Sequence, residues 1–79
     1  MASSLIPRGA MPDAERPGEI FLIKATSQLR ATYQIRLLAF RAVREHSKLV
    51  LSVPSHCVFE ESLRHLVALT GDAIVRADY

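Results

Sequence analysis

Three short apolar runs mark the chain at residues 20–23, 49–53 and 73–75. Polar side chains do not alternate with the apolar ones in these runs, apart from Ser52 in the second. Runs of this kind are typical of strands in parallel sheets that are covered on both faces. Pro54 ends the second run because it cannot donate to a strand ladder. The pattern therefore predicts three strands.

Two longer stretches between these runs have helical character. Neither glycine nor proline interrupts residues 27–46, and Thr26 or Ser27 can accept a hydrogen bond from a free amide at the helix start. The second stretch, residues 58–70, precedes Gly71, which favours a left-handed helix stop. We expect a small α/β domain in the order β-α-β-α-β. Right-handed crossovers would give a three-stranded, mainly parallel sheet with the two helices on one or both faces.

Residues 1–18 differ from the rest of the chain in composition. They contain three of the four prolines and two of the three glycines, which argues against a continuous helix or strand ladder. We expect a flexible leader over residues 1–18 and a single α/β domain over residues 19–79. Residues 5–9, Leu-Ile-Pro-Arg-Gly, resemble a thrombin-type cleavage linker from an expression vector. That resemblance implies that residues 1–10 are vector-derived and that Met11 is the native start.

The two predicted helices differ in how much apolar surface they present. In the second, the apolar side chains form one stripe, as expected of a helix that covers a sheet. In the first, they cover well over half of the circumference, more than three short strands can bury. We therefore predict a homodimer, formed by the first helix, an edge strand or both. The alternative is a monomer whose N-terminal segment covers the surplus. The candidate interface residues are Tyr33, Ile35, Arg36, Leu38 and Phe40.

Arg36 is a charged residue within the apolar sector of the first helix. One interpretation is structural: the guanidinium pairs with Glu19 or Asp78, or extends along the subunit boundary while its alkyl stem is buried. The other is functional, because a guanidinium can hold an anionic ligand through two parallel hydrogen bonds. We favour the structural interpretation.

Composition and charge exclude several classes of protein. The chain has 79 residues, of which 49% are hydrophobic and 23% charged, and this balance excludes a disordered chain. No apolar run approaches the ~20 residues that span a bilayer, and the single cysteine excludes a disulfide framework. No export or import signal is evident, so we expect a soluble cytoplasmic protein.

The strongest candidate ligand site lies where the first two strands end. Connections that leave the carboxyl ends of parallel strands usually hold the ligands of open α/β sheets, and helix N-termini favour anions. Neither connection has the glycines of a phosphate-binding loop, so plain helix caps are the simpler interpretation. The candidate anion- or nucleotide-binding residues are Lys24, Thr26, Ser27, Ser55 and His56.

Basic residues near the first helix form a second, weaker candidate. Such a row can lie along nucleic-acid phosphates. The formal net charge of only +2, the acidic Glu45 within the row and the lack of an aromatic platform argue for an ordinary solvated helix face. The candidate nucleic-acid-binding residues are Arg30, Arg41, Arg44 and Lys48.

The sequence offers little support for catalysis or for metal binding. Cys57 precedes a helix, where a thiol can become nucleophilic, but no third group is evident that would orient His56 toward it. The three histidines lie on separate segments and match no zinc spacing. We therefore expect no cofactor, no metal and no enzymatic activity. The leading interpretation is a non-enzymatic homodimer that acts through protein–protein association; the alternative is a small anion-, nucleotide- or nucleic-acid-binding module.

Overall fold

The strand order explains how the chain is arranged in space. The computed structural model describes residues 11–79. The main sheet has four strands in the order β1-β2-β4-β6, in which β1 is antiparallel to β2 and the other neighbours are parallel. A two-stranded parallel sheet, β3 with β5, lies apart from it. The elements are β1 (Ala14–Arg16), β2 (Glu19–Ile23), β3 (Gln28–Leu29), α1 (Tyr33–Glu45), β4 (Lys48–Val53), β5 (Val58–Phe59), α2 (Glu61–Leu69) and β6 (Ile74–Asp78).

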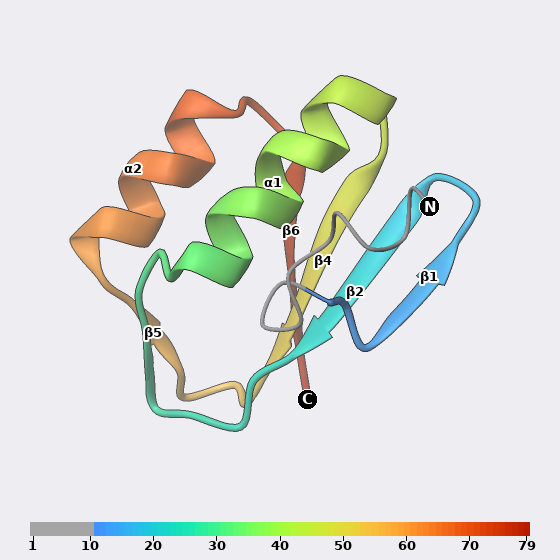
Figure 1. The fold of residues 1–79 in the computed structure, drawn as a ribbon. Coiled ribbons are helices and arrows are strands. Elements are labelled where there is room, and N and C mark those ends of the chain that lie inside the picture. The colour runs from blue at the N-terminus through green and yellow to red at the C-terminus, as the bar shows by residue number, and fades with distance from the viewer. Residues whose placement is uncertain (1–10) are drawn as a thin grey trace.

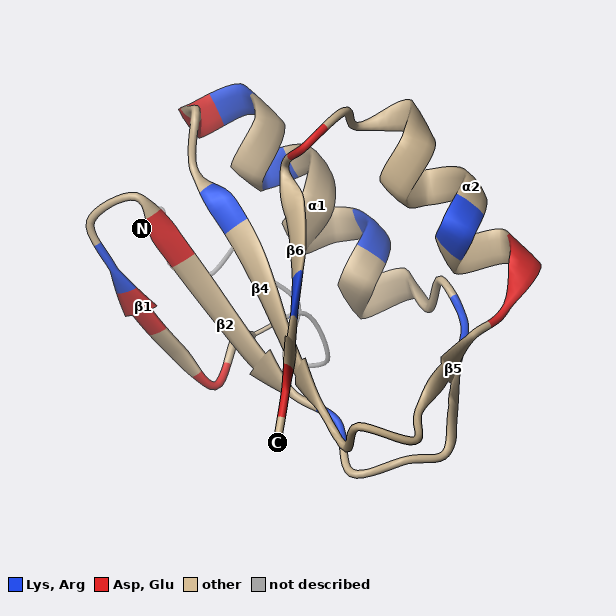
Figure 2. Ribbon diagram, turned by 180° about the vertical axis from the view of Figure 1, so that it is seen from behind, with Lys and Arg blue, Asp and Glu red and all other residues tan. Residues whose placement is uncertain are grey.

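Both helices lie on the same face of the main sheet (Figure 1). The strands β2, β4 and β6 follow one another across the sheet in chain order, so successive crossovers of one hand place their helices on one side. Seen from behind, the other face carries no helix of the described chain (Figure 2). The α/β class with two helices and a mainly parallel sheet is thus confirmed.

The core lies between the helices and one face of the sheet. Residues of β4 alternate strictly between buried and half-exposed, because residues 11–79 cover only one of the two sheet faces. The apolar runs had suggested strands covered on both faces, and that expectation is wrong. On the open face, Val50 is half-exposed and Ile23 is exposed. The largest fully buried side chains are Ile20, Leu22, Ile35, Leu49, Leu51, Val53, Leu63 and Leu66.

The predicted three-stranded sheet is incomplete, because β1 adds a fourth strand from the segment assigned to the leader. Asp13 fixes the start of this strand by accepting a hydrogen bond from the Ile23 amide at 2.7 Å. All three residues of β1 are exposed, so the strand lacks the apolar pattern by which the others were predicted. Residues 1–10 of the predicted leader lie outside the described residues.

The first helix is shorter than predicted. It spans Tyr33–Glu45, and its N-cap is Thr32, whose hydroxyl accepts a hydrogen bond from the Ile35 amide at 3.3 Å. The predicted caps, Thr26 and Ser27, lie before β3 instead. The physical reason is that the six residues before the helix gain backbone partners in β3 and its flanking turns, which compete with helical hydrogen bonds.

The second helix and the last strand also differ from the prediction at their ends. The helix spans Glu61–Leu69, and the first residues of the predicted stretch form β5 beside β3. The last strand, Ile74–Asp78, runs well beyond the predicted residues 73–75. Its charged Arg76 ended the apolar run on which that prediction rested. The strand nevertheless keeps its pairing with β4 as far as Asp78. Charged side chains are tolerated there because β6 is an edge strand.

Candidate functional site

The predicted ligand residues are brought together only in part. Lys24, Thr26 and Ser27 line a pocket of about 430 Å³ between the end of β2 and the start of α1. Ser55 and His56 are exposed on the connection after β4 and do not line this pocket. The remaining residues that line it are Gln28, Leu29, Arg30, Thr32 and Glu60.

Two of the predicted residues that line this pocket already have polar partners within the chain. The ammonium of Lys24 donates to the side-chain oxygen of Gln34 at 2.6 Å, and the hydroxyl of Thr26 donates to the carbonyl of Gln28 at 2.9 Å. The carboxylate of Glu60 is an acidic group in the same pocket. These contacts fit a structural role for the predicted residues, and ligand binding there stays a prediction.

The predicted basic residues do not form a row on one helix. Arg30 precedes α1, and Lys48 lies at the start of β4, where it bridges Asp72 at 3.3 Å. Arg44 is exposed in the last turn of α1. Figure 2 shows acidic segments beside several of the basic ones. This mixed surface differs from the unbroken basic face that phosphates favour, and nucleic-acid binding stays a prediction.

Arg41 pairs with carboxylates of two different elements. Its guanidinium donates to Glu15 of β1 at 2.5 Å and to Glu45 of α1 at 3.1 Å. The hydrogen bond to Glu15 is the main cause that raises the pKa of Arg41, against a smaller opposing effect of burial. Arg41 therefore joins the edge of the sheet to the helical layer.

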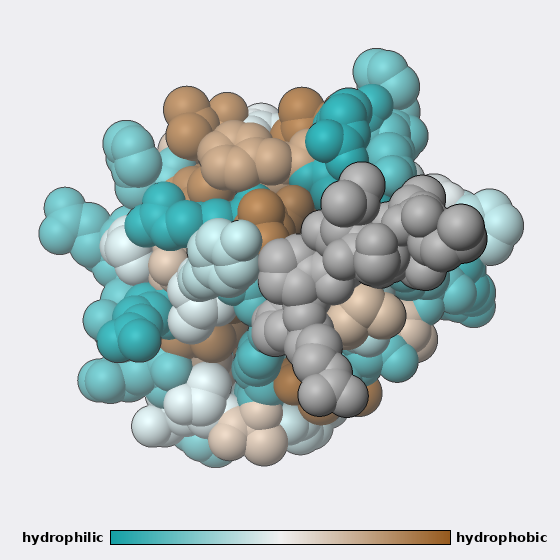
Figure 3. Space-filling model, in the orientation of Figure 1, coloured by the Kyte–Doolittle hydropathy of each residue, from teal (hydrophilic) through white to brown (hydrophobic). Residues whose placement is uncertain are grey.

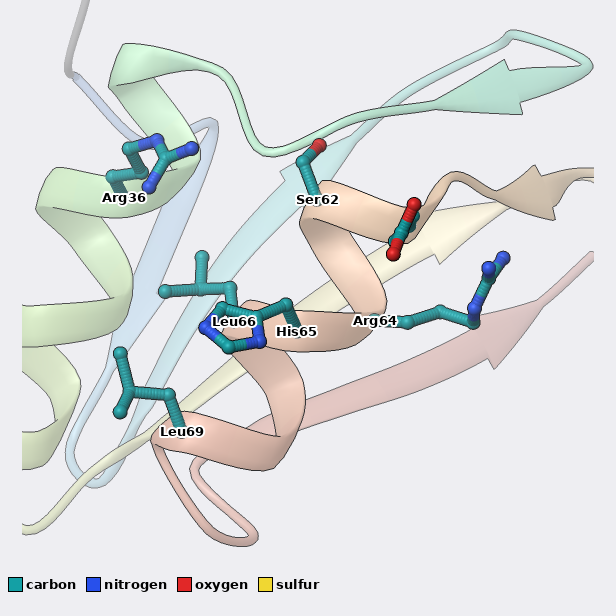
Figure 4. A pocket seen from close by; sticks show the side chains of 7 residues that line it. Arg36, Ser62, Arg64, His65, Leu66 and Leu69 are labelled. Carbon is teal, nitrogen blue, oxygen red and sulfur yellow. The ribbon is translucent and has the colours of Figure 1, made fainter.

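Arg36 lies in a pocket of about 670 Å³ on the α2 side of α1 (Figure 4). Its Nε donates to the carbonyl of Ala31 at 3.1 Å. Neither predicted carboxylate holds it, since Glu19 pairs with Arg16 and Asp78 with Arg76. The expectation of those two partners is wrong because each carboxylate has a closer arginine on its own strand or turn. The other residues that line the pocket are Glu61, Ser62, Arg64, His65, Leu66 and Leu69.

The predicted interface residues divide between surface and core. Tyr33, Arg36 and Phe40 are exposed on α1, whereas Ile35 and Leu38 are buried in the chain's own core. Figure 3 shows apolar groups on the helical side of the molecule, over α1 and α2. The large exposed apolar side chains of these helices are Tyr33, Phe40, Val43 and Leu69.

Cys57 is a buried side chain rather than an exposed nucleophile. Only 4% of it is exposed, and its thiol lies 3.9 Å from the carbonyl of Val58. Burial of this kind fits the packing role of a small apolar residue. Among residues 11–79, no cluster of three or more potential metal ligands is present.

An edge strand was one of the predicted dimer contacts, and the strand order, which the sequence did not predict, places β6 at a free edge of the main sheet. At the two ends of this strand, the carbonyl of Ala73 accepts from Leu49 at 2.7 Å and the amide of Tyr79 donates to Val53 at 2.9 Å. Backbone groups alternate in direction along a strand, so those of Val75 and Ala77 also face β4. The amides and carbonyls of Ile74, Arg76 and Asp78 therefore face outward, where β6 has no neighbouring strand in the described chain.

Side chains on β6 separate into a charged and an apolar row. Arg76 and Asp78 lie on the helix side of the sheet and pair at 2.6 Å. The same guanidinium lies 4.9 Å from the ring centroid of Phe59, which holds it beside β5. Val75 and Tyr79 are exposed on the open face. The alternation of these residue types over residues 74–79 is the signal that marks an edge strand.

The other edge strand of the sheet, β1, is far less suited to pairing with a further strand. It is only three residues long, and Pro12 and Pro17 flank it. Short length, charge and nearby proline are the usual means by which proteins protect a sheet edge from unwanted pairing. The term β6 edge is used below for the outward-facing backbone groups of β6 together with the side chains of residues 74–79.

Comparisons with known proteins return no match: no family model, curated protein or solved structure is significantly similar to this chain. Over the described residues, no helix has both the length and the apolar character needed to cross a membrane.

Proposed function

We propose that this protein acts through protein–protein association, as a non-enzymatic homodimer that forms through the β6 edge. The observation that carries this proposal is the row of outward backbone groups on a five-residue edge strand without proline. Such a row is a ready template for pairing with another strand, because each amide or carbonyl can exchange water for a backbone partner.

The side chains of the β6 edge favour association over simple exposure to water. Val75 is 39% exposed and Tyr79 is 59% exposed, and both lie beside the unpaired backbone. Pairing with a further strand would cover part of both side chains, in addition to satisfying the backbone. A surface that offers hydrogen bonds and apolar area together is typical of strand-addition interfaces.

A second copy of this chain is the partner that the charges fit best. The β6 edge carries one arginine and one aspartate, so it presents equal positive and negative charge. A strongly acidic or basic partner would meet one favourable and one unfavourable charge. An antiparallel copy instead brings the arginine of each chain toward the aspartate of the other. Two-fold homodimers are also the commonest soluble oligomers.

Sedimentation equilibrium of the purified chain tests the proposal. We expect reversible dimers between low and high micromolar concentration. Val75→Lys should weaken association by about tenfold or more, because it places a charge against the partner strand. Phe40→Lys is the matched control on α1 and should leave the dissociation constant unchanged, with far-UV circular dichroism confirming that both variants fold.

Two outcomes would contradict the proposal. One is a monomer throughout the concentration range. The other is a dimer that Phe40→Lys dissociates and Val75→Lys does not, because the exposed face of α1 would then be the interface.

A further inference from the structure

We propose that the two copies pair their β6 strands in one antiparallel register, with the two-fold axis at Ala77. This inference rests on the proposed self-association and adds the register of the contact. Antiparallel strands exchange hydrogen bonds between residues whose backbone groups face one another. In this register Arg76 of one copy lies opposite the partner's Asp78, and Asp78 lies opposite the partner's Arg76. The backbone groups of both residues face outward, toward the partner strand.

Charge complementarity selects this register. Arg76 and Asp78 lie on the same side of the sheet, so each would face the opposite charge directly across the new strand pair. The Nη2 atom of Arg76 approaches the carbonyls of Ser55, at 3.3 Å, and Pro54, at 3.5 Å. Its Nε donates to Asp78 of its own chain. Nη1 has no hydrogen bond to another described residue, which leaves a donor for the partner's Asp78.

The open face of the sheet fits the same register. Val75 lies opposite the partner's Tyr79, which gives a β-branched and aromatic cross-strand pair on each side of the axis. At the axis itself, Ala77 lies opposite the same residue of the partner. This is a pair without backbone hydrogen bonds, where Cα atoms approach to about 4.5 Å and a small side chain is accommodated best.

The neighbouring two-fold registers are less favourable. A two-fold axis at Arg76 places two guanidinium groups directly opposite one another, and an axis at Asp78 does the same with two carboxylates. Like charges in directly opposed positions destabilise a strand pair. An axis at Val75 places Arg76 opposite the partner's Ile74 and so loses the charge pairs.

Disulfide cross-linking measures the register directly. Ala77→Cys should give a covalent dimer on mild oxidation, because its Cα separation of about 4.5 Å lies within the range of a disulfide. Val75→Cys is the matched control on the same strand and face. Its two copies would lie four residues apart, about 13 Å, and should not cross-link. The unsubstituted chain reports any background from Cys57.

Charge reversal provides an independent test. Arg76→Asp and Asp78→Arg should each weaken self-association by about tenfold, because both cross-strand pairs become like-charged. Mixing these two variants should restore a heterodimer, since every pair between them again joins opposite charges. Circular dichroism of each variant shows whether it folds before its association is measured.

The possible outcomes separate this inference from the proposed function. Cross-linking of Ala77→Cys but not Val75→Cys, with recovery in the mixture, supports the register. Cross-linking of Val75→Cys alone, or a dimer that neither cysteine cross-links, overturns the register and leaves self-association standing. Face-to-face packing of the sheets falls in the second group, because stacked sheets lie about 10 Å apart. A purely monomeric chain overturns both proposals.

Discussion

His46 is the residue at which the backbone departs most from its ordinary range. It ends α1 with φ 56° and ψ 38°, in the left-handed region, and its amide donates to the carbonyl of Val43 at 3.3 Å. A side chain with a Cβ atom pays about 1–2 kcal/mol for this conformation, which glycine adopts freely. Gly71, with φ 69°, is the left-handed residue after α2, one position beyond the C-cap Thr70.

Replacement of His46 by glycine should therefore stabilise the protein. We expect His46→Gly to raise the free energy of unfolding by about 0.5–1 kcal/mol, as the relief of strain exceeds the added freedom of the unfolded chain. Gly71→Ala is the opposite change, at the left-handed position after α2, and should lower the free energy of unfolding by about 1 kcal/mol. Urea unfolding of both variants measures the two values. A loss of stability in His46→Gly would show that the imidazole makes a contact that outweighs the backbone strain.

At the scale of elements, the start of α1 is a place where the structure differs from the sequence prediction. The hydroxyl of Thr32 accepts a hydrogen bond from the Ile35 amide, whereas the hydroxyl of Thr26 donates to the carbonyl of Gln28 in β3. A side-chain cap satisfies an amide that has no partner within the helix. Only Thr32 therefore stabilises a helix end.

Thr32→Ala should lower the free energy of unfolding by about 1 kcal/mol. Thr26→Ala is the matched control, since it removes the same hydroxyl from the connection before β3, where it caps no helix, and we expect a change of less than about 0.5 kcal/mol. Chemical denaturation monitored by circular dichroism measures both. A larger loss for Thr26→Ala would place the helix start where the sequence alone had placed it.

Elements with a strong apolar pattern could be predicted, and those held by backbone pairing alone could not. The strands β2 and β4 lie within one residue of their predicted positions, because their apolar runs are also their buried segments. The exposed strand β1 and the two-residue strands β3 and β5 carry no such run. Their hydrogen bonds form between distant segments, which a local pattern does not record.

The candidate site shows the same division. Of the five residues expected together at the carboxyl ends of the strands, Lys24, Thr26 and Ser27 line one pocket, whereas Ser55 and His56 do not. The topological rule for parallel sheets predicts that much. An edge-strand contact was predicted, but not that β6 forms it, because Arg76 interrupts the apolar run and because the position of a strand within its sheet follows from the order of all the strands.

At the scale of the whole molecule, Arg41 connects the two layers. Its partner Glu15 lies on β1, the strand that makes no other side-chain ion pair with the helical layer among the described residues. The guanidinium is 26% exposed, so solvent partly screens the pair. The raised pKa of Arg41 means that its stabilising contribution persists across the neutral range and is lost only as pH rises through that strongly alkaline pKa.

Arg41→Gln should lower the free energy of unfolding by about 0.5–1 kcal/mol at low salt. Molar salt should shrink this difference, because it screens exposed charges. Arg44→Gln, on the same helix and exposed, should change stability by less than about 0.5 kcal/mol. Thermal unfolding at two ionic strengths measures these effects. Equal losses in both variants would show that Arg41 contributes only as a general helix residue.

The small sheet of β3 and β5 ties the two crossover connections to one another. The amide of Val58 donates to Ser27 at 2.8 Å, and the amide of Glu60 donates to Leu29 at 2.8 Å. An insertion within the paired residues of one connection would therefore disturb the other connection as well. Variation at this end of the sheet is therefore expected to come from side-chain exchange within β3 and β5, and from loop growth only outside the paired residues.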